Sequence, residues 1–114
     1  MTTVYKICPE PLWGAAERSG RFDGASVDLA DGYIHLSTGS QVRETASRHF
    51  AGQADLLLIA VDGERLGGDL RWEPSRGGAL FPHLYAPLDP RAARWVMPIP
   101  LAADGVPQIP EDVA

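Results

Sequence analysis

The chain has 114 residues and a formal net charge of −5, from 15 acidic and 10 basic side chains. A length near this value is typical of one domain, and basic residues that are scattered without a stripe exclude nonspecific binding to duplex nucleic acid. The single cysteine, Cys8, excludes an internal disulfide. We expect one domain over residues 1–114, with a tail from residue 104 onward that is either a final hairpin arm or disordered.

The sequence contains no visible targeting or membrane-spanning segment. The N-terminus lacks the basic and apolar regions of a signal peptide, and no apolar run approaches the roughly 18 residues of a membrane span. The sequence therefore predicts a cytoplasmic protein without a membrane partner.

The beginning of the chain predicts a strand followed by a helix. Residues 4–7 form a short run with β-type side chains. Pro9 and Pro11 then open a helical segment, because proline is tolerated in a first turn, and Gly20 supplies its C-cap. Residues 22–31 are expected to form a loop.

A second strand and a second helix follow. The alternating run at residues 33–37 predicts the strand. Thr38 is the predicted N-cap of the helix, because Gln41 lies three residues later as in a capping box, and Gly52 is expected to end it. His49, on this helix, is expected at the surface or at the boundary of the core, without a functional role.

The second half of the chain predicts mainly strands. Residues 56–61 are apolar without a break, which is typical of a central strand buried on both faces. Residues 62–69 form a turn-rich connection. Three further strands are predicted at residues 70–73, 81–85 and 93–99, and Pro98 favours a place at a sheet edge for the last of them or marks its end.

This order of elements predicts an α+β domain with mixed, mostly antiparallel sheets and two early helices. Trp13 and Trp95 are expected to fill its core.

Two of the three histidines lie in segments where apolar and polar side chains alternate. Side chains at i and i+2 share a face of a strand. His35 therefore lies beside Tyr33 and Ser37 on one face, and His83 lies beside Tyr85. These faces form a polar site on a rigid platform if they look into one cleft, which the sequence does not decide.

His35 has two interpretations. In the first, it gives or takes a proton near neutral pH, and Ser37 and Thr38 lie at a helix N-terminus that binds a phosphate or carboxylate. In the second, His35 packs at a sheet edge while the two hydroxyls cap the helix. Capping explains the hydroxyls but not the histidine, which favours a functional His35.

The other candidates also have two interpretations. Tyr85 offers a ring for stacking and a hydroxyl beside His83, or both residues are aromatics of a half-buried sheet face. Glu73 is a candidate general base and Arg71 a donor to an anionic ligand, or the two form a solvated surface pair. Phosphate-loop, zinc and redox motifs are absent from the sequence, and the spacing of the histidines carries no metal signature, so we expect no metal site.

Four segments together resemble the bacterial family called domain of unknown function 952. The resemblance covers nearly the whole chain, and its two histidine motifs are fairly specific. It implies no activity, because the family has no established one. The segments are Val4-Tyr5-Lys6-Ile7, Asp31-Gly32-Tyr33-Ile34-His35-Leu36-Ser37, Leu70-Arg71-Trp72-Glu73 and Phe81-Pro82-His83-Leu84-Tyr85.

The fold of this family is similar to that of ADP-ribosyltransferases, so the resemblance implies an ADP-ribosyltransferase-like fold and NAD as a candidate cofactor. The segment 34–36 resembles the His-containing strand of RNA 2′-phosphotransferases, which share the fold and consume NAD. Lys6 falls where many ADP-ribosyltransferases carry an NAD-gripping histidine or arginine, but lysine lacks the arginine fork. Glu73 falls loosely at the place of their catalytic glutamate.

Three hypotheses about function follow. The leading one is a cleft that binds a nucleotide or another phosphorylated small molecule, with ADP-ribosyl-transfer-like chemistry. The second is a non-catalytic domain that senses a metabolite or binds a partner. The third is a hydrolase or isomerase that uses two histidines as an acid/base pair without a cofactor. The leading hypothesis assigns catalysis to His35, His83 and Glu73 and ligand binding to Lys6, Ser37, Thr38, Arg71 and Tyr85.

Overall fold

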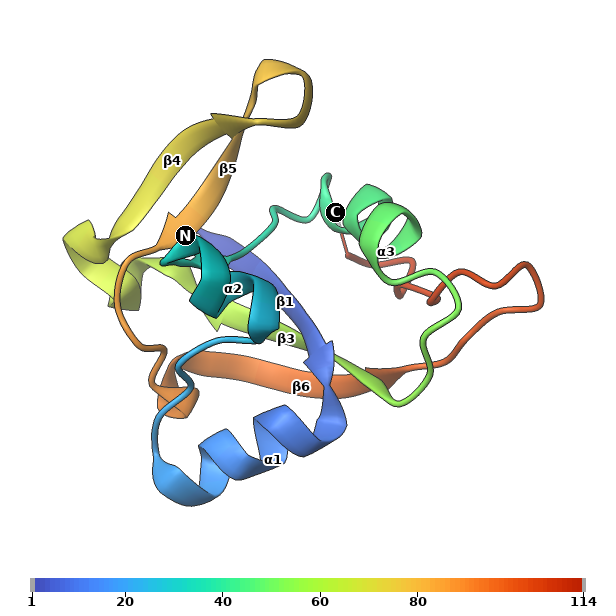
Figure 1. Ribbon diagram of the computed structural model, residues 1–114, viewed down its shortest axis with the longest axis horizontal. Helices are drawn as coiled ribbons and strands as arrows, with labels where there is room; N and C mark the ends of the chain where they lie inside the picture. The colour runs from blue at the N-terminus through green and yellow to red at the C-terminus, as the bar shows by residue number, and fades with distance from the viewer. Residues whose placement is uncertain (1, 114) are drawn as a thin grey trace.

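The computed structural model describes residues 2–113 and contains two three-stranded antiparallel sheets with three α-helices (Figure 1). The strand orders are β1-β3-β6 and β2-β5-β4. The mixed α+β class with antiparallel sheets is therefore confirmed. The strands are β1 (Thr3–Pro9), β2 (Ile34–His35), β3 (Leu56–Asp62), β4 (Leu70–Ser75), β5 (Ala79–Leu84) and β6 (Ala93–Ile99); the helices are α1 (Glu10–Ser19), α2 (Ser26–Asp31) and α3 (Val42–His49), with short 3-10 turns at Gly63–Asp69, Arg76–Gly78 and Pro90–Ala92.

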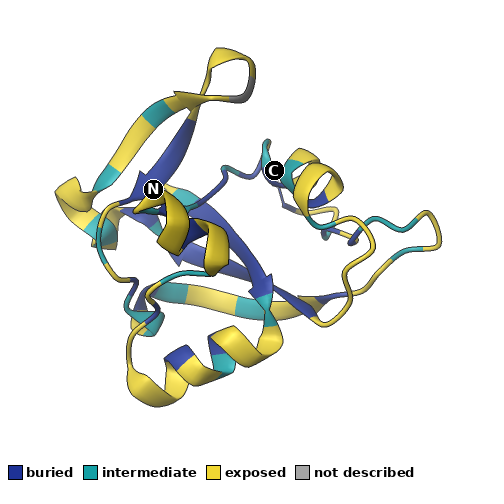
Figure 2. Ribbon diagram, in the orientation of Figure 1, coloured by how far each residue is buried: buried dark blue, intermediate teal, exposed yellow. Residues whose placement is uncertain are grey.

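The first sheet carries the apolar core on both of its faces. Its middle strand, β3, is buried along almost its whole length, as its unbroken apolar sequence predicted, whereas β6 lies at the edge and is largely exposed (Figure 2). One face packs against α1 and the second sheet, with Trp13 and Ile59 buried between them. The other face packs against α3 and the C-terminal segment through Leu58 and Val42.

The second sheet positions the polar residues. Its middle strand, β5, pairs with β4 in a hairpin that projects from the body of the molecule (Figure 1). Its other neighbour is the two-residue strand β2, which pairs Ile34 with Leu84 and His35 with His83. The predicted strand at 33–37 is thus shorter than expected, although Ser37 still forms an isolated bridge with Tyr5 of β1.

The expected loop at residues 22–31 is wrong, because its second half forms α2. The Asp28 carboxylate accepts a hydrogen bond from the backbone N–H of Ala25 at 2.8 Å, which supports the first turn. Gly32, with φ of 87°, ends the helix in the left-handed conformation that glycine adopts readily. The long-range partners that hold Asp28 in place are invisible in the sequence.

The expected start of the next helix is also wrong. α3 begins at Val42, and the side chain of Thr38 contacts Ser40 rather than capping the helix. Only half of the predicted capping box forms, since Gln41 Oε1 accepts from the Thr38 N–H at 3.0 Å. Gly39 to Gln41 form turns before the helix, so its N-terminus does not lie at Thr38.

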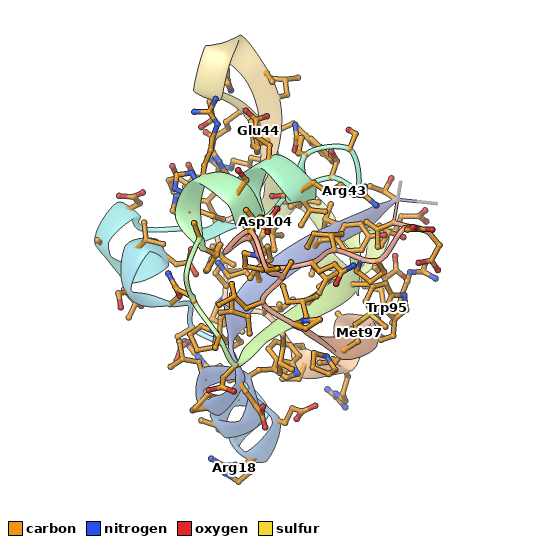
Figure 3. All side chains as sticks on the ribbon, turned by 90° about the vertical axis from the view of Figure 1, so that its right-hand side faces the viewer. Arg18, Arg43, Glu44, Trp95, Met97 and Asp104 are labelled. Atoms are coloured by element: carbon orange, nitrogen blue, oxygen red, sulfur yellow. The ribbon has the colours of Figure 1, made fainter. Side chains whose placement is uncertain are left out.

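Of the two tryptophans expected in the core, Trp13 is buried and Trp95 is not. Trp95 lies on edge strand β6 beside Met97 at the surface (Figure 3), and the two side chains are 38% and 37% exposed. The Trp95 ring lies 6.0 Å from that of Tyr5 between centroids, and the rest of the side chain is left in solvent. That position depends on strand order, which the alternation within one strand does not reveal.

The C-terminal segment packs on the body of the molecule. Leu101 bridges Pro107, and Ile109 and Val113 are buried against the face that also holds α3. Arg43 of α3 donates to the carbonyl of Val113 at 2.7 Å. Across residues 2–113, none of the helices has both the length and the apolar character needed to cross a membrane.

Candidate functional site

The pairing of β2 with β5 places two histidines opposite each other at the same register position, with their rings in an edge-on arrangement. The ring centroids of His35 and His83 are 5.7 Å apart, and both rings contact the ring of Tyr33, at 4.6 and 4.2 Å. His35, His83 and Tyr33 line one cleft of about 630 Å³. The two polar strand faces therefore lie in one place.

His35 lies between two carboxylates. Its Nδ1 is 2.7 Å from Asp28 Oδ1, and its Nε2 is 2.9 Å from Asp31 Oδ2. A carboxylate only accepts hydrogen bonds, and a neutral imidazole has one N–H to donate. Both contacts are hydrogen bonds at once only when the ring is an imidazolium. Asp31 is largely exposed, whereas Asp28 is fully buried, so Asp28 is the fixed partner of His35.

A buried ion pair anchors this end of the site. Lys6 Nζ lies 2.8 Å from Asp28 Oδ2 and donates to the backbone carbonyl of His35 at 3.1 Å, and both charged side chains are buried. Asp28 Oδ1 also accepts from the backbone N–H of His35 at 3.0 Å. These contacts join β1, α2 and β2 at one carboxylate, so they fix the backbone and ring of His35 together.

The pKa of Asp28 reflects these contacts. Burial by itself would raise the pKa, because it removes water from the charged form. The hydrogen bonds from His35 and the charge and hydrogen bond of Lys6 outweigh burial and hold the pKa of Asp28 well below its ordinary value. Asp28 is therefore ionised at neutral pH, and His35 has a permanent negative charge beside Nδ1.

The second histidine has its own carboxylate. His83 Nδ1 is 2.8 Å from Glu73 Oε1, and the Tyr85 hydroxyl donates to the same oxygen at 2.6 Å. These two hydrogen bonds, that from Tyr85 above all, hold the pKa of Glu73 below its ordinary value, and Glu73 in turn raises the pKa of Tyr85. A proton held on Nδ1 leaves Nε2 of a neutral His83 as an acceptor.

Tyr33 connects the two histidines. Besides the His35 and His83 rings, it contacts the ring of Tyr85 at 5.1 Å between centroids. Burial, together with the nearby carboxylates of Asp31 and Glu73, raises the pKa of the Tyr33 phenol. Tyr33 therefore stays protonated at neutral pH, and its ring lies against both histidines.

The residues expected to act or bind fall into three groups. His35 and His83 line the cleft, as do Lys6 and Ser37, although the Lys6 ammonium is paired with Asp28. A second group touches the histidines or their neighbours from outside the cleft lining: Glu73, Tyr85 and Arg71, whose guanidinium lies 4.7 Å from the centroid of the Tyr85 ring. Thr38 forms the third group, outside both. The catalytic and ligand-binding roles of all these residues stay predictions.

The expected anion-binding helix end is not present at Ser37 and Thr38. The buried Ser37 Oγ lies 2.9 Å from Thr45 Oγ1, and the helix starts only at Val42, after the turn that follows Thr38. Backbone N–H groups in that turn are used locally, since Gln41 and Val42 both donate to the Thr38 carbonyl. This correction removes one of the arguments for a phosphate at this point.

Sequence reasoning gave no site role to Asp28, Asp31 or Tyr33, although it placed Tyr33 on the same strand face as His35. The i to i+4 spacing of Asp31 and His35 is a signal that would have found Asp31. Asp28 lies seven residues before His35, a spacing that carries no signal unless α2 is recognised. His49, expected at the surface, is exposed and also lines the cleft.

Within residues 2–113, no group of three or more His, Cys, Asp or Glu side chains could hold a metal ion. Lys6 does not make the NAD contact that the resemblance assigns to it. Lys6 lies where the resemblance to ADP-ribosyltransferases puts an NAD-gripping residue. Its ammonium is buried and directed at the Asp28 carboxylate and the His35 carbonyl rather than at a pyrophosphate in the cleft.

Similar proteins place the chain in a family without assigning it an activity. A crystal structure of protein CC0527 from Caulobacter crescentus is 56% identical, with a TM-score of 0.92 and 94% of each chain covered. A crystal structure of a double mutant of CC0527 is 54% identical, with a TM-score of 0.91 and 94% of each chain covered. The solution NMR structure of CC0527 has 56% identity and a TM-score of 0.84, covering 95% of this chain and 93% of that one.

No curated protein matches the chain. The family described as "Protein of unknown function (DUF952)" matches residues 7–96, which is most of the chain. The protein therefore belongs to the DUF952 family.

Proposed function

We propose that the cleft binds a small organic molecule and that His35 and His83 act on it as an acid/base pair, in a hydrolase or isomerase reaction that needs no cofactor. The observation that carries this proposal is that each histidine has a carboxylate within 2.8 Å of Nδ1 while both rings line one cleft. A carboxylate on Nδ1 fixes the orientation and tautomer of an imidazole and supports proton transfer at its other nitrogen.

The two histidines have different surroundings, which suits opposite roles. His83 has one carboxylate partner, Glu73, and its Nε2 is the nitrogen that would take a proton from the ligand. His35 lies between two carboxylates, Asp28 and Asp31, so each of its ring nitrogens faces an acceptor for an N–H. It would give a proton from Nε2 once the ligand displaces the exposed Asp31. Pairs of titratable groups in contrasting environments are a common basis for acid/base assignments.

The experiment is a pH–rate profile with a panel of p-nitrophenyl esters and lactones as probes. We expect a bell-shaped profile in the wild-type protein, with one limb lost in His83→Gln and the other in His35→Gln. His49→Gln, which changes a cleft histidine outside the proposed acid/base pair, should keep both limbs. Equal rates in wild type and both variants would contradict the proposal. Ligand binding without turnover that survives Glu73→Gln would favour the sensing hypothesis instead.

A second candidate is a site for a nucleotide or phosphorylated molecule on an ADP-ribosyltransferase-like fold. The cleft volume of about 630 Å³ favours it, because cofactor sites commonly have volumes of several hundred Å³. The Lys6–Asp28 ion pair and the missing helix end at Thr38 weigh against it. Titration of NAD, ADP-ribose and inorganic phosphate into labelled protein separates the candidates, since amide shifts at His35 and His83 with any of the three would favour this second one.

A further inference from the structure

We propose that the molecule bound in this cleft is uncharged and carries an apolar group, which lies on a wall formed by Ile7, Pro9, Leu12, Val27 and Phe50. This inference rests on the proposed function of the same cleft and names the chemical class of its ligand. The apolar wall, as these five residues are called below, lines the cleft together with the histidines.

The cleft extends beyond the two histidines to the apolar wall. α2 contributes Val27 and α1 contributes Leu12, while Phe50 directly follows α3. In Figure 1, α2 and α3 lie on either side of β1, the strand that supplies Ile7 and Pro9. Three helical segments and one strand thus turn apolar side chains toward one hollow.

Two members of the apolar wall are exposed in the absence of a ligand. Leu12 is 40% and Val27 is 53% exposed. Single exposed apolar residues are normal, but these two come from different helices and line the same cleft. A bound apolar group would remove water from both side chains. The free energy of binding would then become more favourable in proportion to the apolar area that is buried. The cleft lining also contains His49 and Gln53, so the wall has polar groups near it.

Charge at the histidine end argues for an uncharged ligand. Lys6 and His35, two of the basic residues that line this end, are each already in contact with a carboxylate: Lys6 with Asp28, and His35 with Asp28 and Asp31. A phosphate or carboxylate on the ligand would come close to the Asp31 carboxylate, which also lines the cleft, and like charges repel. A neutral amide or hydroxyl accepts from Tyr33 or His35 and donates to His83 without that cost, and an ester accepts without it.

The test uses three probes that separate the two parts of the ligand. N-benzylacetamide has a neutral polar end and an apolar ring, acetamide has only the polar end, and phenyl phosphate has the ring with an anionic end. Each is titrated at millimolar concentrations into isotope-labelled protein, and amide and side-chain methyl shifts are followed. We expect N-benzylacetamide to shift signals of Leu12 and Val27 together with those of His35 and His83, and to bind most tightly of the three.

Matched variants test the apolar wall itself. Val27→Ser should weaken N-benzylacetamide binding roughly tenfold, as expected for a lost apolar contact. Leu29→Ser is the control, because Leu29 lies on the same helix with 65% exposure and outside the cleft lining; it should leave binding unchanged. Leu12→Ser provides a second, independent variant on α1.

The outcomes separate this inference from the proposed function. Tighter binding of phenyl phosphate than of N-benzylacetamide would overturn the inference, as would equal binding by the Val27→Ser and Leu29→Ser proteins. If N-benzylacetamide shifts NMR signals of the apolar wall while His83→Gln leaves the rates with the ester and lactone probes unchanged, the inference is supported and the acid/base proposal is contradicted. If phenyl phosphate binds more tightly than N-benzylacetamide and His83→Gln also leaves every probe reaction unchanged, both the inference and the acid/base proposal are contradicted.

Discussion

The two histidines of the cleft are held by carboxylates in nearly the same geometry, yet the two pairs belong to different kinds of structure. Asp28 lies 2.7 Å from Nδ1 of His35, and Glu73 lies 2.8 Å from Nδ1 of His83. Asp28 is fully buried and paired with the buried Lys6, whereas the Glu73 side chain is 36% exposed on a projecting hairpin.

This difference separates two roles of a carboxylate beside a histidine, which are stabilising the fold and orienting the imidazole ring. Asp28 joins three elements, so removing it disturbs the fold as well as the ring of His35. The Glu73 carboxylate contacts His83 and Tyr85, which belong to its own hairpin and the residue after it. Removing it should therefore disturb the His83 ring and the Tyr85 hydroxyl and leave the rest of the fold unchanged. Structural cost and chemical role can therefore be measured separately at the two ends of one site.

The largest expected effect comes from Asp28→Asn. This change leaves the Lys6 ammonium buried at 4% exposure beside a neutral amide. Breaking a buried ion pair by removing one partner costs about 3–5 kcal/mol, and we expect a loss of that order in the free energy of unfolding, measured by urea denaturation.

A second variant keeps this prediction testable even if Asp28→Asn fails to fold. Adding Lys6→Met removes the unpaired charge, so the double variant should be more stable than Asp28→Asn alone. A loss below about 1 kcal/mol in Asp28→Asn, the range of an exposed ion pair, would show that Lys6 and Asp28 do not form a buried pair.

Acid should destabilise the protein through the same carboxyl. The pKa of Asp28 in the folded protein lies below its ordinary value of 3.8. A carboxyl of this kind contributes its full stability above the unfolded-state pKa and loses it as the pH falls toward the folded-state pKa. We therefore expect the free energy of unfolding to fall with pH below about 4.

The control for the acid effect is the Lys6→Met, Asp28→Asn double variant, which lacks the titrating carboxyl. Its stability should depend less steeply on pH in the same range, as measured by urea denaturation at successive pH values. Parallel curves for the two proteins would assign the acid effect to other carboxyls.

At the other end of the site, Glu73→Gln should change chemistry rather than stability. The substituted side chain would be partly exposed, so the urea midpoint should match that of wild type. The amide removes the charge that holds the Nδ1 proton of His83, so the ¹⁵N shifts of His83 should change while those of His35 stay the same. A large drop in stability would mean that Glu73 is a structural residue like Asp28.

The smallest expected effect belongs to Tyr85→Phe. Loss of the hydroxyl removes the hydrogen bond that contributes most to the lowered pKa of Glu73, so this pKa should rise toward its ordinary value. A ¹³C titration of the Glu73 carboxyl measures the change. An unaltered titration curve would show that the Tyr85 contact with Glu73 is not formed in solution.

Many of the helices and strands were predictable because the sequence signals for them are local. The unbroken apolar run of β3 and the glycine at the end of α1 each report on the structure of their own neighbourhood. Alternation also put His35 and His83 on polar strand faces, although the pairing that brings their rings together depends on strand order.

The parts that sequence reasoning missed depend on contacts between distant segments. α2 has only six residues and no side chain at its N-cap that accepts a hydrogen bond, so its local signal is weak. It is held by the contact between Asp28 and Lys6, which are 22 residues apart. The family resemblance assigned Lys6 a role in binding a ligand. A buried lysine is rare without a partner, and the partner that it has, Asp28, becomes visible only in the folded chain.

The most direct test of the account is the protonation pattern of the two imidazoles, measured by long-range ¹H–¹⁵N NMR at neutral pH. We expect a proton on Nδ1 of both His35 and His83, because each Nδ1 lies within 2.8 Å of a carboxylate. Asp28→Asn and Glu73→Gln should each alter the pattern of one ring only. An unprotonated Nδ1 on either histidine would contradict the claim that paired carboxylates orient the two rings toward one cleft.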